Sequence, residues 1–262
     1  MKKAARINID DVFHVHTFRC GHAEFIPDEA YIEKAVEMGA KGIWFTDHAP
    51  FPGNPFGARM AYEELDEYLD SLHALKKKYL GRIAVHVGLE IEYFPSFDRK
   101  GYYAQLKKDP RVEVMLLGQH MAETEPGRYS FSLPSFVLSQ QEYQLLGKAV
   151  RQGIRTGYFD AAAHPDRIFR RKRCWDAGME ETAGEIIRAA AECELPLEMN
   201  LCSYEYRYYC RPQFWQMVQP GSSVITGLDA HSLYELEERY RRQLQWGSND
   251  QILRHLQGER NE

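Results

Sequence analysis

Short apolar runs alternate along the chain with longer segments whose apolar residues recur at helical spacing. The runs at 112–117 and 223–228 are mostly apolar, which is typical of strands buried on both faces in a parallel sheet. The pattern predicts seven strands, at 11–16, 42–47, 83–90, 112–119, 158–163, 195–200 and 223–229.

Helical patterns lie between the predicted strands. Leucines at intervals of three or four residues predict a helix at 62–79, and another is expected to begin at Pro27 and end at Gly39. The remaining predicted helices lie at 139–155, 180–194 and 232–245. This alternation indicates an α/β fold with a closed or nearly closed parallel barrel. The alternative, an open doubly wound sheet, usually carries a glycine-rich phosphate loop after its first strand, where histidines stand here.

Length and composition suit one domain. The chain has 262 residues, 44% of them apolar, and it contains no internal repeat or linker-like stretch. Residues 1–262 are therefore expected to form a single domain, with 258–262 as a frayed end.

Charge and cysteine content exclude several classes of protein. The net charge of -5 argues against a general nucleic-acid binder, which needs an excess of positive charge. No run approaches the roughly 20 apolar residues that span a membrane, and no apolar segment follows the basic N-terminal residues, so no signal peptide is expected. The five cysteines form no CxxC pair, which favours a reducing cytoplasm over a disulfide framework or a thiolate zinc site.

Ten histidines are present, and most stand where a predicted strand ends. Side chains two residues apart on a strand point to the same face, so His14 and His16 should project together. Asp229 and His231 should do the same. Active sites of parallel barrels form at the carboxyl ends of the strands. Other potential ligands that end or closely follow strands are His22, His48, Glu90, His120 and His164.

This set of imidazoles and carboxylates predicts a cluster of metal ions, for which Zn, Fe and Mn are all suited. The alternative is a purely structural cluster, which would bury many polar groups without partners at a high cost. His73 and His255 are expected at the surface. His86 shares the strand face of Glu90 but lies four residues deeper, which predicts a histidine packed inside the barrel rather than a ligand. Cys20 is expected to pack in the tight turn before His22.

Four segments carry a resemblance to a known family. Residues 14–22 read His-Val-His-Thr-Phe-Arg-Cys-Gly-His, and residues 45–52 read Phe-Thr-Asp-His-Ala-Pro-Phe-Pro. Residues 88–90 read Gly-Leu-Glu, and residues 227–231 read Gly-Leu-Asp-Ala-His. In this order they resemble the motifs of the polymerase and histidinol phosphatase (PHP) superfamily, and they are most similar to its histidinol-phosphatase branch. The resemblance implies a distorted seven-stranded (β/α)7 barrel, similar to a TIM barrel.

The resemblance also implies a centre of three metal ions. The implied ligands are His14, His16 and Asp229 with Glu90 for the first ion, Glu90 with His120 and His164 for the second, and His22, His48 and His231 for the third.

The reaction implied for this branch is hydrolysis of a small-molecule phosphate monoester, with L-histidinol phosphate as the leading substrate. A hydroxide held between two metal ions would attack phosphorus, with Glu90, Asp229 and His231 as catalytic ligands. The leaving group would take its proton from metal-bound water or from Asp47. The arginines expected to bind the substrate are Arg170, Arg171, Arg207 and Arg59.

Two other functions stay open. One is a nucleotide phosphodiesterase or exonuclease of the same superfamily, which the acidic net charge and the motifs disfavour. The other is a metal-loaded binding domain without turnover. The segments that follow His120 and Asn200 depart from the pattern of the branch, and both are expected to face the substrate.

Overall fold

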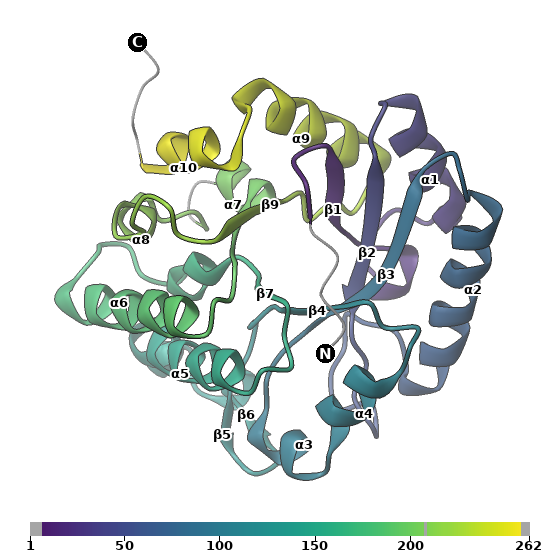
Figure 1. Ribbon diagram of the computed structural model, residues 1–262. Coiled ribbons are helices and arrows are strands. Elements are labelled where there is room, and N and C mark those ends of the chain that lie inside the picture. Colours follow the sequence, from purple (N-terminus) through teal and green to yellow (C-terminus); the bar gives the residue numbers. More distant parts are fainter. Residues whose placement is uncertain (1–6, 207–208, 258–262) are drawn as a thin grey trace.

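The computed structural model describes residues 7–206 and 209–257 (Figure 1). Arg207 and the predicted frayed end at 258–262 lie outside the described residues. Seven parallel strands form one sheet in the order β1-β2-β3-β4-β7-β8-β9. Their bounds are Asp11–Val15 (β1), Gly42–His48 (β2), Ala84–Ile91 (β3), Val114–Leu117 (β4), Ala161–Ala162 (β7), Leu197–Asn200 (β8) and Val224–Gly227 (β9). Each strand lies inside its predicted segment to within one residue, so the strand prediction is confirmed.

Backbone hydrogen bonds join the segment after β9 to β1. The Leu228 N–H donates to the Phe13 carbonyl oxygen at 2.8 Å. The Ala230 N–H donates to the His14 carbonyl oxygen at 3.1 Å. These bonds bring the two ends of the sheet together, so the predicted barrel is confirmed and the open doubly wound sheet is wrong. The barrel is distorted at β7, where only two residues keep strand geometry.

Helices cover the outside of the barrel (Figure 1). Five of them match predicted segments: α1 Asp28–Glu37, α2 Leu65–Lys78, α5 Ser135–Arg155, α6 Ala177–Glu192 and α9 Leu233–Trp246. Five others span only five to nine residues each, too few for helical periodicity to reveal them. They are α3 Pro95–Arg99, α4 Tyr102–Lys108, α7 Leu201–Glu205, α8 Pro212–Gln216 and α10 Asn249–Gln257.

The segment that follows His120 contains a two-stranded hairpin, formed by β5 (Glu123–Glu125) and β6 (Arg128–Tyr129). Short 3-10 helices occur at Phe18–Cys20, Tyr62–Glu64, Ser130–Ser132 and Pro165–Phe169. Among the helices in the described ranges, none combines the length and the apolar character needed to cross a bilayer.

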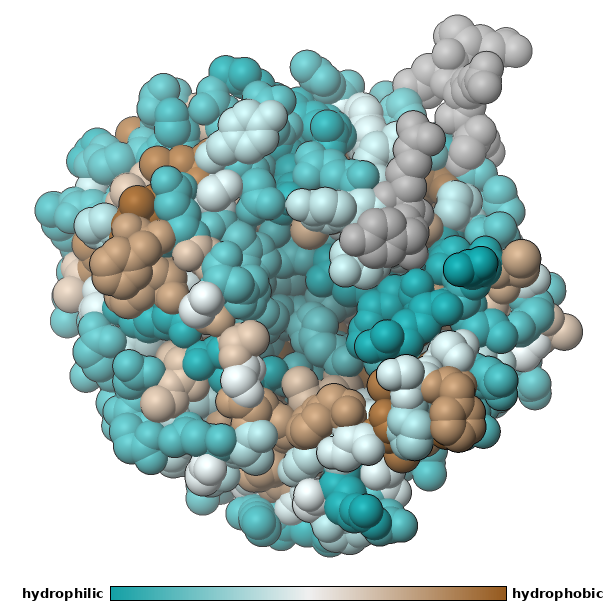
Figure 2. Space-filling model, turned by 180° about the vertical axis from the view of Figure 1, so that it is seen from behind, coloured by the Kyte–Doolittle hydropathy of each residue, from teal (hydrophilic) through white to brown (hydrophobic). Residues whose placement is uncertain are grey.

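The inside of the barrel is apolar beneath the strand ends and polar at them. His86 stacks on Trp44 with ring centroids 3.8 Å apart, and its Nδ1 lies 3.1 Å from Glu113 Oε2, so it is packed inside the barrel as predicted. Seen from behind, the molecule has a hydrophilic hollow near its centre (Figure 2). The apolar interior cluster consists of Phe13, Trp44, Val114, Leu116, Ala161, Ala163 and Ile225.

Gly88 of β3 allows the close approach of β4. A Cβ atom at this position would lie 2.2 Å from Val114 Cγ1 and 2.4 Å from the Val114 carbonyl oxygen. We therefore expect Gly88→Ala to lower the free energy of unfolding by roughly 1–3 kcal/mol, measured by urea denaturation of the metal-free protein. The matched control is Gly57→Ala, whose Cβ would meet nothing within 4 Å and should change stability by less than about 0.5 kcal/mol. Equal stability of the two variants would contradict this account of the β3–β4 contact.

Candidate metal centre

The nine residues predicted as metal ligands converge at the carboxyl ends of the strands. They come from β1 and the turn after it, from β2 and β3, and from the segments that follow β4, β7 and β9. They fall into overlapping groups of three whose ligand atoms lie within 4.8 Å of one another. The predicted ligands in these groups are His14, His16, His22, His48, Glu90, His120, His164, Asp229 and His231, and one group of His16 and His231 is completed by Cys20.

A bulge in β1 places both histidines of the first pair inside the barrel. The register of β1 against β2 shifts between Phe13 and Val15, and His14 has a φ of +67°. Because Phe13 already points into the interior, regular alternation would turn His14 outward. The bulge brings His14 inside and resets the alternation, so Val15 packs in the main hydrophobic core and His16 faces the interior.

Glu90 lies at the centre of these residues and is only 1% exposed. Its Oε2 is 3.4 Å from His14 Nε2 and 3.5 Å from His16 Nε2. Asp229 Oδ1 is 3.3 Å from His16 Nε2. Two ligand atoms that each lie ~2.0–2.1 Å from a tetrahedral ion are ~3.3 Å apart, so these separations fit one ion held by four side chains.

The other carboxylate oxygen of Glu90 faces two further imidazoles. Oε1 is 2.7 Å from His164 Nε2 and 3.5 Å from His120 Nε2. A carboxylate with imidazoles at both oxygens has the arrangement required to bridge two ions.

His22, His48 and His231 form a further group, and His22 and His231 are its more exposed members. Nδ1 of His22 and Nδ1 of His231 each contact the backbone carbonyl oxygen two residues earlier, at 2.9 and 3.1 Å. These contacts leave Nε2 of each ring available for a metal ion. His48 is shared between groups, because its Nδ1 also lies 3.0 Å from Glu90 Oε2.

Five buried atoms at this centre have no hydrogen-bond partner among the residues that the structure describes. Buried polar atoms are nearly always paired, and leaving them unpaired costs free energy. Metal ions would satisfy the four that face Glu90 or the other ligands, so the residues present fit a metal cluster, whereas His16 Nδ1 faces Asp47. The atoms are His14 Nε2, His16 Nδ1, His16 Nε2, Glu90 Oε2 and His231 Nε2.

The carboxylates of the centre are held in their charged form. Burial alone would raise the pKa of Glu90, but the surrounding imidazoles, chiefly His120 and His14, hold it well below its usual range. Burial would also raise the pKa of Asp229, but Arg167 and His14 hold it well below its usual value. Arg167 Nη2 donates to Asp229 Oδ2 at 2.6 Å, which leaves Oδ1 facing His16. Both carboxyl groups are therefore ready to bind a cation.

Three buried carboxylates outside the predicted ligand set contact the far nitrogens of the imidazoles: Glu198, Glu92 and Asp47. Glu198 Oε1 is 2.6 Å from His14 Nδ1, and Glu92 Oε1 is 3.1 Å from His120 Nδ1. Asp47 Oδ1 is 3.5 Å from His16 Nδ1. Such carboxylates fix the orientation and tautomer of a ligand imidazole.

Sequence reasoning assigned no role to Glu92 or Glu198. Strand alternation could have found Glu92, because it stands two residues after Glu90 and so shares its strand face. Asp47 was predicted as a catalytic residue. Its Oδ2 accepts hydrogen bonds from the N–H and the hydroxyl of Thr17, and its Oδ1 accepts one from the His48 N–H.

Two of the arginines predicted to bind substrate share one buried carboxylate. Arg170 Nη2 donates to Glu142 Oε1 at 2.9 Å and to the His120 carbonyl oxygen at 3.0 Å. Arg171 Nε donates to Glu142 Oε2 at 2.8 Å. Arg170 therefore lies beside the ligand set, whereas the side chain of Arg171 is about half exposed. Arg207, the third of these arginines, is outside the described residues.

Arg59, the fourth predicted arginine, is buried and donates to both oxygens of Glu92 at 2.9 and 3.0 Å. It therefore supports Glu92, and through Glu92 it supports His120. Arg167 was not among the predicted substrate-binding residues, although its contact with Asp229 brings it closest to the ligand set.

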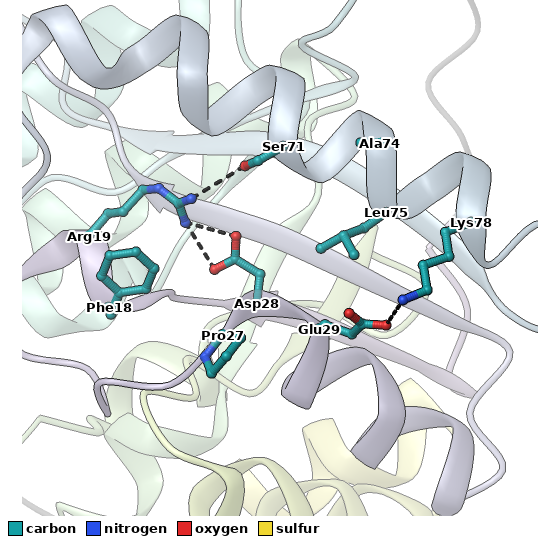
Figure 3. Close-up of a pocket in the computed structure, with 9 residues that line it drawn as sticks. All are labelled: Phe18, Arg19, Pro27, Asp28, Glu29, Ser71, Ala74, Leu75 and Lys78. Atoms are coloured by element: carbon teal, nitrogen blue, oxygen red, sulfur yellow. Dashed lines mark hydrogen bonds and ion pairs between the residues drawn. The ribbon is translucent and has the colours of Figure 1, made fainter.

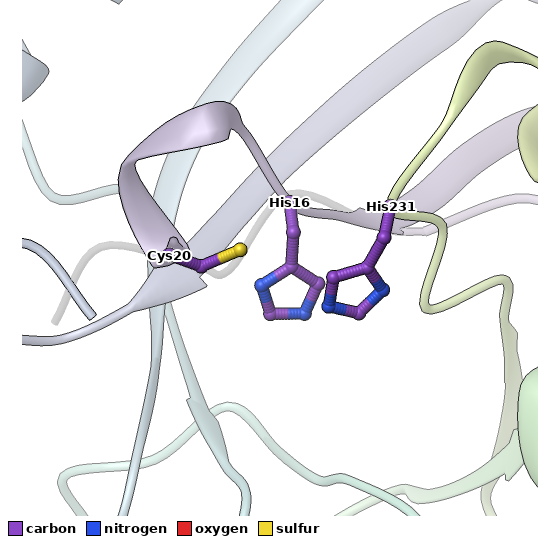
Figure 4. Close-up of side chains that lie close together, drawn as sticks. All are labelled: His16, Cys20 and His231. Atoms are coloured by element: carbon purple, nitrogen blue, oxygen red, sulfur yellow. The ribbon is translucent and has the colours of Figure 1, made fainter. Parts of the chain in front are cut away.

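Cys20 lies beside His16 and His231 (Figure 4), in the 3-10 turn where the sequence places it. It is fully buried, and burial raises the pKa of its thiol to about 12. The group is therefore a neutral thiol near pH 7 in the metal-free protein.

A separate pocket lies outside the barrel, between the start of α1 and α2 (Figure 3). Arg19 pairs with Asp28 at 2.8 Å within it, and Lys78 pairs with Glu29 at 2.5 Å. None of the nine predicted ligands lines it.

Residues 13–201 match the family model of the PHP domain. This range covers well over half of the chain and contains seven of the nine predicted ligands, with only Asp229 and His231 beyond it. The chain therefore belongs to the PHP domain family.

Among curated relatives, a Deinococcus radiodurans protein assigned as a histidinol-phosphatase is 32% identical over 162 residues, which cover 58% of this chain and 59% of that protein. The histidinol-phosphatase of Bacillus subtilis is 30% identical over 118 residues, or 43% of this chain and 44% of that enzyme. The chain thus matches less than two thirds of the length of either relative.

Two solved structures share the fold. A proposed histidinol phosphatase of Listeria monocytogenes superposes with a TM-score of 0.71 at 16% identity, covering 88% of this chain and 99% of that chain. The histidinol phosphate phosphatase of Lactococcus lactis, in a complex with zinc, L-histidinol and phosphate, gives a TM-score of 0.64 at 18% identity, covering 90% and 92% of the two chains.

The pKa of His16 predicts that metal binding depends on pH. Burial lowers this pKa, but the nearby carboxylates of Asp229 and Asp47 outweigh burial and raise it to about 9 in the metal-free protein. A metal ion binds the deprotonated imidazole, so below about pH 9 binding must displace a proton. We expect zinc affinity to increase between about pH 6 and 8, with proton release measured by titration calorimetry in buffers of different ionisation enthalpy. Asp47→Asn should release fewer protons, and binding heats that are independent of the buffer would contradict the prediction.

Proposed function

We propose that the protein is a metal-dependent phosphomonoesterase of the histidinol-phosphatase type, with L-histidinol phosphate as its leading substrate. The observation that carries this proposal is the buried Glu90 carboxylate, which has imidazoles at both oxygens and ligand atoms without partners around it. The histidinol-phosphatases among its relatives support the reaction. The zinc, L-histidinol and phosphate in the Lactococcus complex support the metal and the substrate.

The proposed centre holds three ions, of zinc, iron or manganese. The distances around Glu90 and the groups of ligand atoms support an allocation in which Glu90 is shared between two of them. The proposed ligands are His14, His16, Asp229 and Glu90 for the first ion, Glu90, His120 and His164 for the second, and His22, His48 and His231 for the third. Two of the described groups of ligand atoms, His14–His16–Glu90 and His22–His48–His231, agree with this allocation, and two others join residues of neighbouring ions.

When bound, such ions lower the pKa of a coordinated water and neutralise charge on the phosphate oxygens. The residues of the chain supply the geometry. Arg167 turns Oδ1 of Asp229 towards His16, and Arg59 holds the Glu92 carboxylate against His120.

The contacts of Asp47 support a positioning role rather than proton donation. Both of its oxygens accept hydrogen bonds from Thr17 or the His48 N–H, and its side chain lies behind His16. Of the predicted substrate-binding arginines that the structure describes, Arg170 is the best candidate for phosphate, because it is partly exposed beside His120. Arg171 is a weaker candidate, since its described contact is to Glu142, away from the ligands.

The activity is tested on purified protein after its metal content has been measured. We expect release of inorganic phosphate from L-histidinol phosphate to exceed release from nucleoside monophosphates and from an aryl phosphate. Hydrolysis confined to nucleotides would favour the nucleotide-directed members of the superfamily. No release from any monoester, with three ions bound, would overturn the phosphatase assignment in favour of a binding domain.

The shared role of Glu90 is tested by Glu90→Gln, which keeps the size of the side chain and removes its charge. We expect two ions to be lost together, measured by elemental analysis after gel filtration, and phosphate release to fall by about 100-fold or more. The matched control is Glu113→Gln, because Glu113 contacts His86 and Lys76 rather than a proposed ligand. Loss of a single ion would refute the bridge.

A further inference from the structure

Glu198 of β8 is fully buried and contacts two proposed ligands through different oxygens. Its Oε1 lies 2.6 Å from His14 Nδ1, and its Oε2 accepts a hydrogen bond from the His164 backbone N–H at 3.0 Å. His14 belongs to β1 and His164 follows β7, so one carboxylate connects opposite sides of the ligand set. The Asn200 side chain also donates to Oε2, at 3.1 Å, which holds the carboxylate in place.

Both of these ligands have unusual backbone conformations. The φ angle is +67° at His14 and +30° at His164, in the left-handed region that residues with a Cβ atom rarely adopt. Such conformations persist only where the surrounding structure holds them. Glu198 fixes the ring of His14 and the backbone of His164, so it acts where both conformations need support.

Gly227 of β9 provides the space for this carboxylate. A Cβ atom at Gly227 would lie 1.8 Å from Glu198 Oε1 and 2.4 Å from its Cδ. Gly227 is not among the glycines with positive φ, so the backbone itself does not require glycine here. The position requires glycine because the side chain of Glu198 fills the space next to it.

We infer that Glu198, in the space left by Gly227, is a positioning residue that couples the first and second metal positions by fixing His14 and His164 together. The inference rests on the proposed function, because it takes His14 and His164 as ligands of different ions.

The chemistry of the carboxylate carries the argument. A carboxylate only accepts hydrogen bonds, so the proton of a neutral His14 ring lies on Nδ1 and the lone pair of Nε2 faces Glu90. An amide at position 198 could instead donate to Nδ1, which would place the proton on Nε2 and block the metal-facing nitrogen. A change at Glu198 therefore acts on metal binding without removing any ligand.

The test compares zinc binding by the wild type, Glu198→Gln and the matched control Glu113→Gln. Zinc content is measured after gel filtration, and zinc affinity is measured by competition with a chelator. We expect Glu198→Gln to lose two ions together, with the affinity for both lowered roughly 10- to 100-fold. Glu113→Gln should retain the affinity of the wild type. In the zinc-loaded wild type, the His14 Nδ1 proton should give a far-downfield NMR signal that Glu198→Gln lacks.

Gly227→Ala tests the contact between Glu198 and His14 in a second way. The added methyl group displaces the Glu198 carboxylate but leaves the chemistry of the carboxylate unchanged. We expect it to lose the same two ions and the same NMR signal, while Gly57→Ala retains both. Should Glu198→Gln fail to fold, Gly227→Ala decides the question. If both variants stay unfolded with and without zinc, Glu198 serves the fold rather than the metal positions, and the inference is overturned.

Other outcomes also overturn the inference: wild-type zinc affinity in Glu198→Gln, or loss of one ion only. Failure of the proposed function looks different. A wild type that binds no zinc would refute the metal centre itself. A wild type that holds zinc but hydrolyses no phosphate ester would refute the activity. The zinc binding of Glu198→Gln would still test the inference in that case.

Discussion

The burial of the Glu90 carboxylate is the constraint on which the rest of the site depends. An unpaired carboxylate inside a protein is strongly unfavourable, so the surrounding structure must supply cations or hydrogen bonds. Five imidazoles lie within 3.5 Å of its two oxygens, and they come from strands and loops on different sides of the barrel. Gly118 leaves space for this carboxylate, because a Cβ atom there would lie 2.0 Å from Glu90 Oε1. A closed barrel can supply partners from every direction around one central group, which an open sheet cannot.

Closure of the barrel and strain in the backbone meet at the same residues. Of the six non-glycine residues with positive φ in the described chain, three are proposed ligands: His14, His164 and Asp229. The His14 carbonyl oxygen accepts one of the hydrogen bonds that join the segment after β9 to β1. The buried Arg239 donates to the Asp229 carbonyl oxygen at 2.6 Å and so supports the segment after β9 that joins β1. The bonds that complete the barrel therefore also hold ligands in conformations that they would not adopt alone.

The sequence predicted the strands and the gathering of nine side chains, because both follow from local patterns. Apolar runs mark buried strands, and residues that end parallel strands meet at one end of a barrel. The contacts behind the ligands could not be predicted in this way. Alternation paired His14 with His16 correctly, yet Phe13 also faces the interior, and only the bulge reconciles the three. That bulge depends on pairing with strands distant in sequence, which no local pattern encodes.

The arginines also show that local sequence patterns do not predict contacts between distant parts of the chain. Arg59 looks like a free cation in a loop, but its partner Glu92 lies on the segment after β3, and only the fold brings them together. Arg167 has no sequence feature that separates it from Arg170 and Arg171, although it alone of these three pairs with Asp229. Short helices such as α3 and α8 were not predicted for a different reason, because five residues are too few to display a helical period.

The formal charges around the centre give an independent reason for metal ions and for a phosphate substrate. Two buried guanidinium groups, of Arg59 and Arg167, pair with carboxylates of this site, and the imidazoles are neutral when they act as ligands. Five buried carboxylates belong to the proposed ligands or contact them, so three negative charges remain uncompensated. In the metal-free protein the raised pKa of His16 reflects this excess, because protons take the place of metal ions. Three divalent ions would reverse the sign of the site, and a cationic site attracts a phosphate monoester dianion rather than a neutral ligand. The five carboxylates are Asp47, Glu90, Glu92, Glu198 and Asp229.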